Sequence, residues 1–201
     1  MRVLCIFFIF FLILFASTES VGQRKSNIRN IPALGLEVDI LPYITGGYYG
    51  SIWYGIGQVR GRFVVANVNV PSFYIPSGFK DNNIYAYALL VDYFIRSNDF
   101  SKFWIGVGPE YWDASITSES TGSTAYYSNY IISVGLGYSW KFYRNFYLNP
   151  WLAFHILAAG DSHVDVDGED FKPPTVTPEI SLKIGWYLSF GKNSKRYLKS
   201  K

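Results

Sequence analysis

Apolar and polar residues alternate with a period of two over most of the chain, from Leu34 to Phe190. Successive side chains of an extended strand point to opposite faces, so this period predicts β-strands. The pattern is clearest in residues 179–190, where every even position is apolar or aromatic and the odd positions are small or polar except at Tyr187. Residues 129–140 repeat it. The sequence therefore predicts an all-β protein built from long two-faced strands.

The apolar face of these strands has a graded composition that indicates what it contacts. In residues 83–95, Tyr85, Tyr87 and Tyr93 flank the aliphatic Leu89 and Val91. Aromatic side chains prefer the two membrane interfaces, so aliphatic centres with aromatic ends are typical of strands that cross a bilayer. We expect an aromatic girdle from eight residues: Tyr85, Tyr87, Tyr93, Tyr130, Tyr138, Trp140, Trp186 and Phe190.

The opposite face is rich in Gly, Ala and Ser, whereas a water-exposed face would carry more Lys, Glu and Arg. Small side chains suit the inside of a narrow barrel. The apolar face is thus predicted to meet lipid and the small face to line the lumen. The alternative, a soluble lipocalin-like barrel, would reverse both faces.

Breaks in the alternation predict the number of strands. Eight strands are expected, at 35–44, 48–56, 60–70, 83–95, 102–116, 125–140, 146–158 and 176–190. The connections 71–82, 117–124 and 159–175 are long and alternate with short ones, as in barrels with short periplasmic turns and longer outer loops. Residues 45–47 are either a hairpin or a kink in one strand over 34–56, and the second alternative would leave seven strands.

Composition agrees with a barrel and not with a bundle of membrane helices. The 201 residues are 19% aromatic and only 16% charged, with 18 glycines, and mean hydropathy is close to neutral. Strands in hydrocarbon must close on themselves, because each unpaired backbone group there costs several kcal/mol. We therefore expect an eight-stranded antiparallel up-and-down transmembrane β-barrel.

The N-terminal segment has the layout of a secretory signal peptide. Met1 and Arg2 precede an unbroken apolar run from Val3 to Ala16, and small residues at Ser20 and Gly22 predict cleavage before Gln23. A retained signal anchor is the alternative. The expected organisation is a signal peptide at 1–22, a flexible leader at 23–33, an outer-membrane barrel at 34–190 and a basic tail at 191–201.

Removal of this segment would also remove Cys5, the single cysteine, so the mature chain would have no disulfide or thiol chemistry. The net charge of +3 comes from five basic residues after Phe190, and the remainder is slightly acidic. No basic stripe remains for nucleic acid, which we exclude as a partner.

The chain resembles the small eight-stranded outer-membrane barrels of Gram-negative bacteria. The segments FYLNPWLAFH (146–155) and TPEISLKIGW (177–186) carry this resemblance, which covers residues 34–190. It implies a cell outer-membrane location, outer-membrane lipid and lipopolysaccharide as surroundings, and the barrel-assembly machinery as a partner. It implies no activity. Such barrels often end on an aromatic residue, whereas eleven residues follow Phe190 here.

Nine polar residues fall on the predicted inner face and form a candidate lumen network. They are Glu37, Asp39, Arg60, Arg62, Asp92, Glu110, His155, Glu179 and Lys183. Charges inside a narrow barrel need partners or water. The favoured interpretation is a structural plug and a non-enzymatic role in the envelope; the alternative is a narrow channel for small polar solutes. Glu179 and Lys183 lie about 13 Å apart along one strand and would need neighbours such as Asp92 or Arg62 to connect them.

The remaining candidates for chemistry are two histidines and an acidic loop. His155 or His163, each with a nearby serine, could serve a lipid-modifying enzyme, although His163 beside Ser162 and Asp161 does not make a triad by itself. Loop 159–175 contains DVDGED, which suggests either part of a calcium loop or a hairpin turning at Asp167–Gly168. The hairpin is favoured because the terminal bidentate Glu is absent. We therefore predict no catalytic, cofactor or metal residues.

Overall fold

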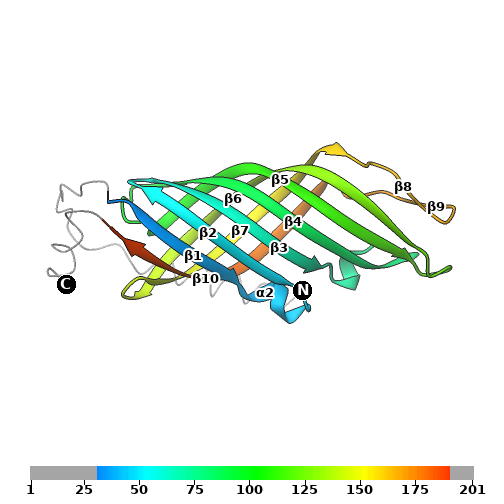
Figure 1. Cartoon of the computed structure of the whole chain (residues 1–201), viewed down its shortest axis with the longest axis horizontal. Coiled ribbons are helices and arrows are strands. Elements are labelled where there is room, and N and C mark those ends of the chain that lie inside the picture. Colours follow the sequence, from blue (N-terminus) through cyan, green and yellow to red (C-terminus); the bar gives the residue numbers. More distant parts are fainter. Residues whose placement is uncertain (1–30, 191–201) are drawn as a thin grey trace, which may run out of the picture.

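The computed structural model describes residues 31–190, and these form one closed antiparallel barrel (Figure 1). The predicted signal peptide, the basic tail and most of the leader lie outside the described residues. The barrel strands follow each other in the order β1–β10–β7–β6–β5–β4–β3–β2. Their bounds are β1 (Ala33–Asp39), β2 (Tyr48–Ile56), β3 (Val59–Asn69), β4 (Phe79–Phe94), β5 (Lys102–Ser118), β6 (Thr124–Tyr143), β7 (Phe146–Gly160) and β10 (Val176–Ser189). The predicted eight-stranded barrel is confirmed.

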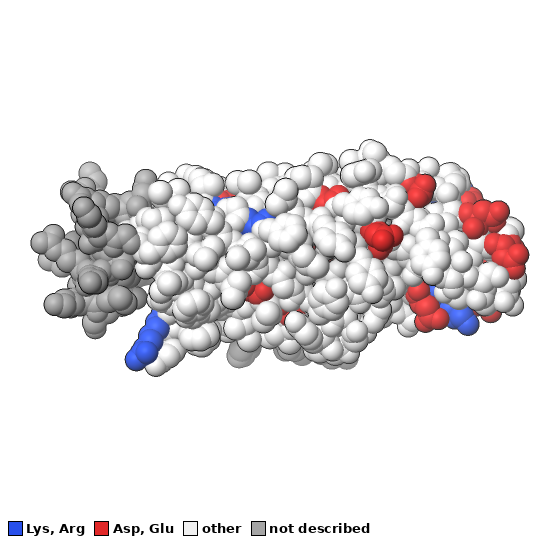
Figure 2. Space-filling view, in the orientation of Figure 1, with Lys and Arg blue, Asp and Glu red and all other residues white. Residues whose placement is uncertain are grey.

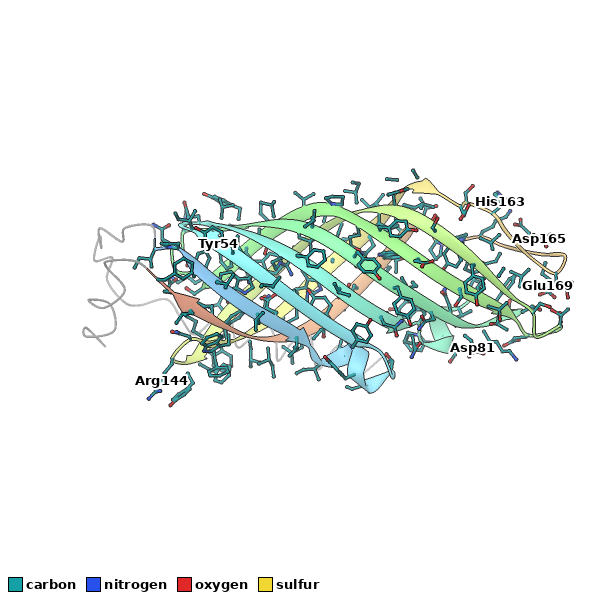
Figure 3. All side chains as sticks on the ribbon, viewed as in Figure 1. Tyr54, Asp81, Arg144, His163, Asp165 and Glu169 are labelled. Atoms are coloured by element: carbon teal, nitrogen blue, oxygen red, sulfur yellow. The ribbon has the colours of Figure 1, made fainter. Side chains whose placement is uncertain are left out.

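Three small elements lie outside the barrel wall. They are the helix α2 (Ile40–Ile44), the 3-10 turn η1 (Ser72–Tyr74), and the hairpin of β8 (Val164–Val166) and β9 (Glu169–Phe171). The connection β3–β4, the hairpin β5–β6 and the acidic hairpin β8–β9 lie at one end of the barrel, and the short turns lie at the other (Figures 1 and 3). We call these the loop end and the turn end. Within residues 31–190 no helix is long and apolar enough to cross a membrane.

The first predicted strand is wrong at its end. Residues 40–44 are helical and not extended, because the Asp39 carboxylate accepts a hydrogen bond from the Leu41 amide at 3.1 Å and caps the helix. Pro42 follows within the first turn, where its missing N–H is tolerated and from where it cannot continue a strand ladder. The chain then turns back into β2, so residues 34–56 form two strands.

The acidic loop forms the hairpin that Asp167–Gly168 predicted. Both residues have positive φ, 56° and 86°, as a two-residue turn between twisted strands requires. The hairpin is not wholly solvated, because Val164, Val166 and Phe171 are buried in an apolar cluster at the loop end. Its other face carries carboxylates, which gather at this end of the molecule in Figure 2.

The outside of the barrel is apolar along its length. Leu89, Leu136 and Ile184 are exposed in the centre of their strands. The eight predicted girdle residues all point outward: seven are exposed, and Tyr138 is half-buried beside Phe103 at a ring distance of 4.8 Å. In Figure 2 the middle of the visible face carries few charged atoms. A soluble barrel would need the opposite arrangement, so this is the surface of a membrane-spanning barrel.

Candidate functional site

The lumen near the turn end is filled by two arginines and two carboxylates. Arg60 and Arg62 alternate with Gly61 on β3, so both point inward, and the register places Asp92 of β4 directly opposite Arg60. Glu37 reaches the same point from β1. All four side chains have 0% exposure, and their charges balance.

Asp92 joins both arginines. Its Oδ2 accepts hydrogen bonds from Arg60 Nε at 2.8 Å and Arg62 Nε at 2.7 Å, and its Oδ1 accepts from Arg62 Nη2 at 2.9 Å. Glu37 Oε1 accepts from Arg60 Nη1 at 2.8 Å. Charge-assisted bonds of this length are among the strongest in proteins, and a buried charge needs them. We call these four residues the plug.

Aromatic residues surround the plug on all sides. Arg60 lies over the rings of Trp53, Phe94 and Trp104 at 5.1 to 5.6 Å, and Arg62 lies 5.0 Å from both Trp104 and Trp151. These cation–π contacts occupy the guanidinium faces. The carboxylates occupy part of the edges, and Arg60 Nη2 and Arg62 Nη1 have no hydrogen-bond partner in the described chain. Little room is left in this half of the lumen for a solute.

A second ring of hydrogen bonds ties the aromatic residues to the plug. Tyr147 donates its hydroxyl to Glu37 at 2.8 Å and accepts the indole N–H of Trp53 at 2.8 Å. Asn149 donates to Glu37 at 3.1 Å and accepts from Trp104 at 2.9 Å. Glu37 of β1 therefore has partners on both β3 and β7, which fixes one arrangement of the lumen.

The glycines of the inner face make this packing sterically feasible. A Cβ at Gly137 would lie 2.5 Å from the Trp104 ring, and one at Gly106 would lie 2.4 Å from an Asp92 oxygen. Small residues on this face are thus places where another strand's large side chain lies directly over the backbone.

The connection between β4 and β5 closes the turn end. Phe100 is buried and packs against Trp53, Phe94 and Tyr187 at ring distances of 5.1, 5.6 and 6.3 Å. It has a φ of 57°, a left-handed conformation that tertiary packing must hold. The turn that carries Phe100 therefore closes the barrel below the plug, and we call Phe100 the stopper.

Asp99 organises this turn, which lies outside the strands. It accepts hydrogen bonds from Ser97 at 2.8 Å and Ser101 at 2.6 Å and pairs with Lys141 at 2.9 Å. Burial raises the pKa of Asp99, but the Lys141 ammonium and the serine hydroxyls outweigh it and lower the pKa to about 2. The ion pair thus links the turn to β6 across the neutral pH range.

A separate polar cluster lies nearer the loop end. His155 of β7 contacts Glu110 through Nδ1 at 3.1 Å and Glu179 through Nε2 at 2.7 Å. Two indoles support the carboxylates: Trp112 donates to Glu110 and Trp151 donates to Glu179, both at 2.9 Å. Both imidazole nitrogens are therefore occupied by carboxylates.

The nine predicted lumen residues all lie inside the barrel, eight of them buried and Glu179 half-buried. They do not form one network. Asp39 caps α2, and Lys183 lies over Trp151 at 3.5 Å and Tyr49 at 4.5 Å. The expectation that Asp92 or Arg62 connects Lys183 to Glu179 is wrong: Trp151 contacts both, by its ring face and its N–H.

Sequence reasoning missed the aromatic and amide part of the lumen. Trp53, Trp104, Tyr147, Asn149 and Trp151 carry most of the contacts to the charges. The signal was present in the alternation. Trp53 falls on the face of Ser51 and Gly55, Trp104 falls on the face of Gly106, and the three residues of β7 fall on the face of Ala153 and His155.

The predicted alternatives with chemistry find no support in the geometry. His163 pairs with Asp170 at 2.9 Å on the exposed hairpin, and neither histidine is hydrogen-bonded to a hydroxyl in the described chain. No cluster of His, Cys, Asp and Glu between residues 31 and 190 could hold a metal ion. Asp165 accepts the Gly168 amide at 2.8 Å, which uses that carboxylate to form the turn.

The half of the lumen toward the loop end is hollow. A cavity of about 830 Å³ lies there, lined mainly by apolar side chains, with Glu110, His155, Glu179 and Asp39 among its polar lining residues. The lumen is therefore sealed at the turn end and open beyond it.

No protein-family model and no curated protein matches this chain. Solved structures that are similar to this chain include the following two. The N-terminal β-barrel domain of Pseudomonas aeruginosa OprF shares 13% identity with a TM-score of 0.52, over 80% of this chain and 98% of that domain. Neisserial surface protein A, NspA, shares 15% identity with a TM-score of 0.45, over 80% of this chain and 96% of that one. The likeness to the OprF domain is one of fold, and it confirms the small eight-stranded barrel that the resemblance implied.

Proposed function

We propose that this chain is an outer-membrane barrel that does not conduct solutes and acts as a non-enzymatic component of the envelope. One observation carries the proposal: the plug of Arg60, Arg62, Glu37 and Asp92 has no exposed side chain. A path for ions would need water along these charges. The apolar exterior and the barrel fold support the membrane location.

The same observation speaks against the narrow channel. An eight-stranded interior is just wide enough for side chains, and here it is occupied by charges, aromatic rings and the Phe100 stopper. A lipid-modifying activity lacks its nucleophile, because the partners of His155 are both carboxylates.

Planar-bilayer recording of the purified full-length protein tests the proposal. The wild-type protein should give no steady conductance. The triple variant R62A/D92A/F100A removes one cation, one anion and the aromatic ring that closes the turn end, keeps the lumen charge unchanged and opens space beside Trp104, so it should give conductance steps.

The matched control is D170A/K172A, which removes an ion pair from the exposed hairpin and should stay silent. Steady wild-type conductance at neutral pH would refute the sealed lumen.

A further inference from the structure

The barrel wall has a lateral gap next to the cavity. Residues Val176–Ser189 of β10 pair with β7 along most of their length, but β1 pairs only with Lys183–Ser189. Extending the register would place Tyr43 opposite Glu179, yet that part of the chain is helical. Over Val176–Leu182 the edge of β10 facing β1 therefore lacks a strand partner in the described chain, a length of about 23 Å at ~3.3 Å per residue.

The gap lies at the level of the lipid-facing band. In Figure 1, α2 lies part-way along the barrel, whereas β4, β5 and β6 continue beyond it toward the loop end. The register pairs Ile180 with Leu152, and Leu152 with Leu136 in the apolar centre of β6. The gap thus faces the leaflet of the bilayer nearer the loop end, the outer leaflet in the predicted orientation.

The rim of the gap consists of exposed apolar side chains and carries no charge in its flanking segments. Ile44 of α2, Phe73 of η1 and Ile180 of β10 are 74%, 79% and 76% exposed, and only Tyr126 is comparable among the large apolar side chains of residues 31–190. The rim segments 40–50, 63–79 and 173–178 contain no charged residue. Apolar exposure of this degree marks a surface that contacts lipid or an apolar ligand.

The cavity behind the gap is continuous with this rim. Ile44, Phe73 and Ile180 line it together with inward-facing residues such as Val64, Ala66 and Ala86. An apolar chain entering from the side would therefore stay in contact with apolar side chains all the way into the lumen.

The polar groups of the cavity define the other end of the ligand. Asp39 Oδ2, Asn129 Oδ1 and the hydroxyls of Tyr49 and Ser181 line the cavity, belong to residues less than a tenth exposed, and make no hydrogen bond of normal geometry within the described chain. The Ser181 hydroxyl lies near the Asp39 carboxylate. Two of these atoms can only accept hydrogen bonds. Buried polar atoms normally find partners, so a ligand that donates hydrogen bonds fits them.

The sum of the lumen charges disfavours an anionic head, although the Lys183 ammonium opposite Asp39 has no hydrogen-bond partner in the described chain. The lumen holds five carboxylates, at Glu37, Asp39, Asp92, Glu110 and Glu179, against at most four cations, at Arg60, Arg62, His155 and Lys183. The plug pairs two of each, which leaves the cavity side with the acidic excess. A carboxylate or phosphate placed there would meet like charge in a poorly solvated site.

We propose that the gap is a lateral port through which the lumen takes up a single-chain amphiphile from the outer leaflet. A hydrogen-bond-donating head without negative charge reaches the Asp39 carboxylate beside the rim, and the hydrocarbon chain lies along Ala86 toward Ile84 and Ile131. This inference rests on the proposed membrane location but not on the sealed turn end.

Photolabelling in vesicles tests the port. Full-length protein in phosphatidylcholine vesicles is irradiated with trace dodecanol, dodecylamine or dodecanoic acid, each carrying a terminal diazirine, and the labelled residues are mapped. All three should label the lipid-facing Val134 and Leu136. The alcohol and the amine should also label the cavity residues Ile84 and Ile131, with the acid roughly ten-fold lower there, which corresponds to about 1.4 kcal/mol.

Two controls separate cavity binding from general contact with lipid. Excess unlabelled dodecanol should abolish cavity labelling and leave Leu136 labelling unchanged. Ala86→Trp fills the cavity and should abolish cavity labelling, whereas Ala159→Trp, on the exposed face near the end of β7, should not.

The competition experiment needs no variant, so the test holds even if Ala86→Trp does not assemble. Absent or unsaturable cavity labelling, or equal cavity labelling by the acid, overturns the port. These outcomes are independent of the bilayer recording, which alone tests the seal.

Discussion

Neutralising Asp92 should destabilise the barrel far more than neutralising a surface aspartate. Asp92→Asn keeps the shape of the side chain but removes the charge that accepts three hydrogen bonds from two buried arginines, at 2.7 to 2.9 Å. One oxygen becomes an amide NH₂, which donates and so opposes a guanidinium N–H. Glu37 would then face Arg60 and Arg62 alone.

The expected loss follows from the burial of the group. Removing one partner of a fully buried ion pair leaves an uncompensated charge and destabilises proteins by about 3–5 kcal/mol. We expect this range for Asp92→Asn, because the Asp92 side chain has 0% exposure and no water to replace the carboxylate. Asp113→Asn makes the same chemical change at an exposed position of β5 and should alter stability by less than about 0.5 kcal/mol.

The measurement is reversible denaturant unfolding in lipid vesicles, followed by tryptophan fluorescence, since Trp104 contacts the plug. The double variant D92L/R62M removes the broken pair from both sides and should recover most of the stability, because apolar groups of similar size replace buried ion pairs well. A loss for Asp92→Asn as small as that for Asp113→Asn would refute the account of the plug, as would additive effects in the double variant.

Three further predictions follow from the packing, the turn and the exterior. Gly137→Ala places a methyl group against an indole ring and should reduce unfolding free energy by about 1–3 kcal/mol, whereas Gly50→Ala, with nothing within 4 Å, should be nearly neutral in the same assay. The pKa of Asp99 is lowered to about 2 in the folded state, so its pair with Lys141 stabilises the protein above the unfolded pKa near 4. The stability difference between wild type and Asp99→Asn, about 1–2 kcal/mol after allowance for partial exposure, should stay constant from pH 5 to 8 and shrink between pH 4 and 2; a difference that grows on acidification contradicts it. A spin label at Leu136 should relax with lipid-dissolved oxygen and not with an aqueous nickel chelate, and the reverse result would remove the membrane assignment.

The alternation of residue types was enough to determine the barrel and its two faces. A period of two with aromatic ends predicts a barrel in lipid, because a sheet there must close. The small residues of the opposite face leave room for the large side chains that other strands send into a narrow lumen. The inward direction of Arg60, Arg62 and Asp92 follows from the same parity. These properties are local, so they can be inferred from the sequence one strand at a time.

The partners of the charges required the tertiary structure. Glu37 of β1 meets Arg60 across the neighbouring β2, but it meets Tyr147 of β7 only after the chain has gone round the barrel. The choice of Trp151 as the contact between Lys183 and Glu179 depends on registers that the sequence does not specify. After Asp39 the chain can either form the capped helix α2 or extend β1 along β10. The helix leaves residues 176–182 of β10 without a strand partner in the described chain, and this outcome is visible only in the packed barrel.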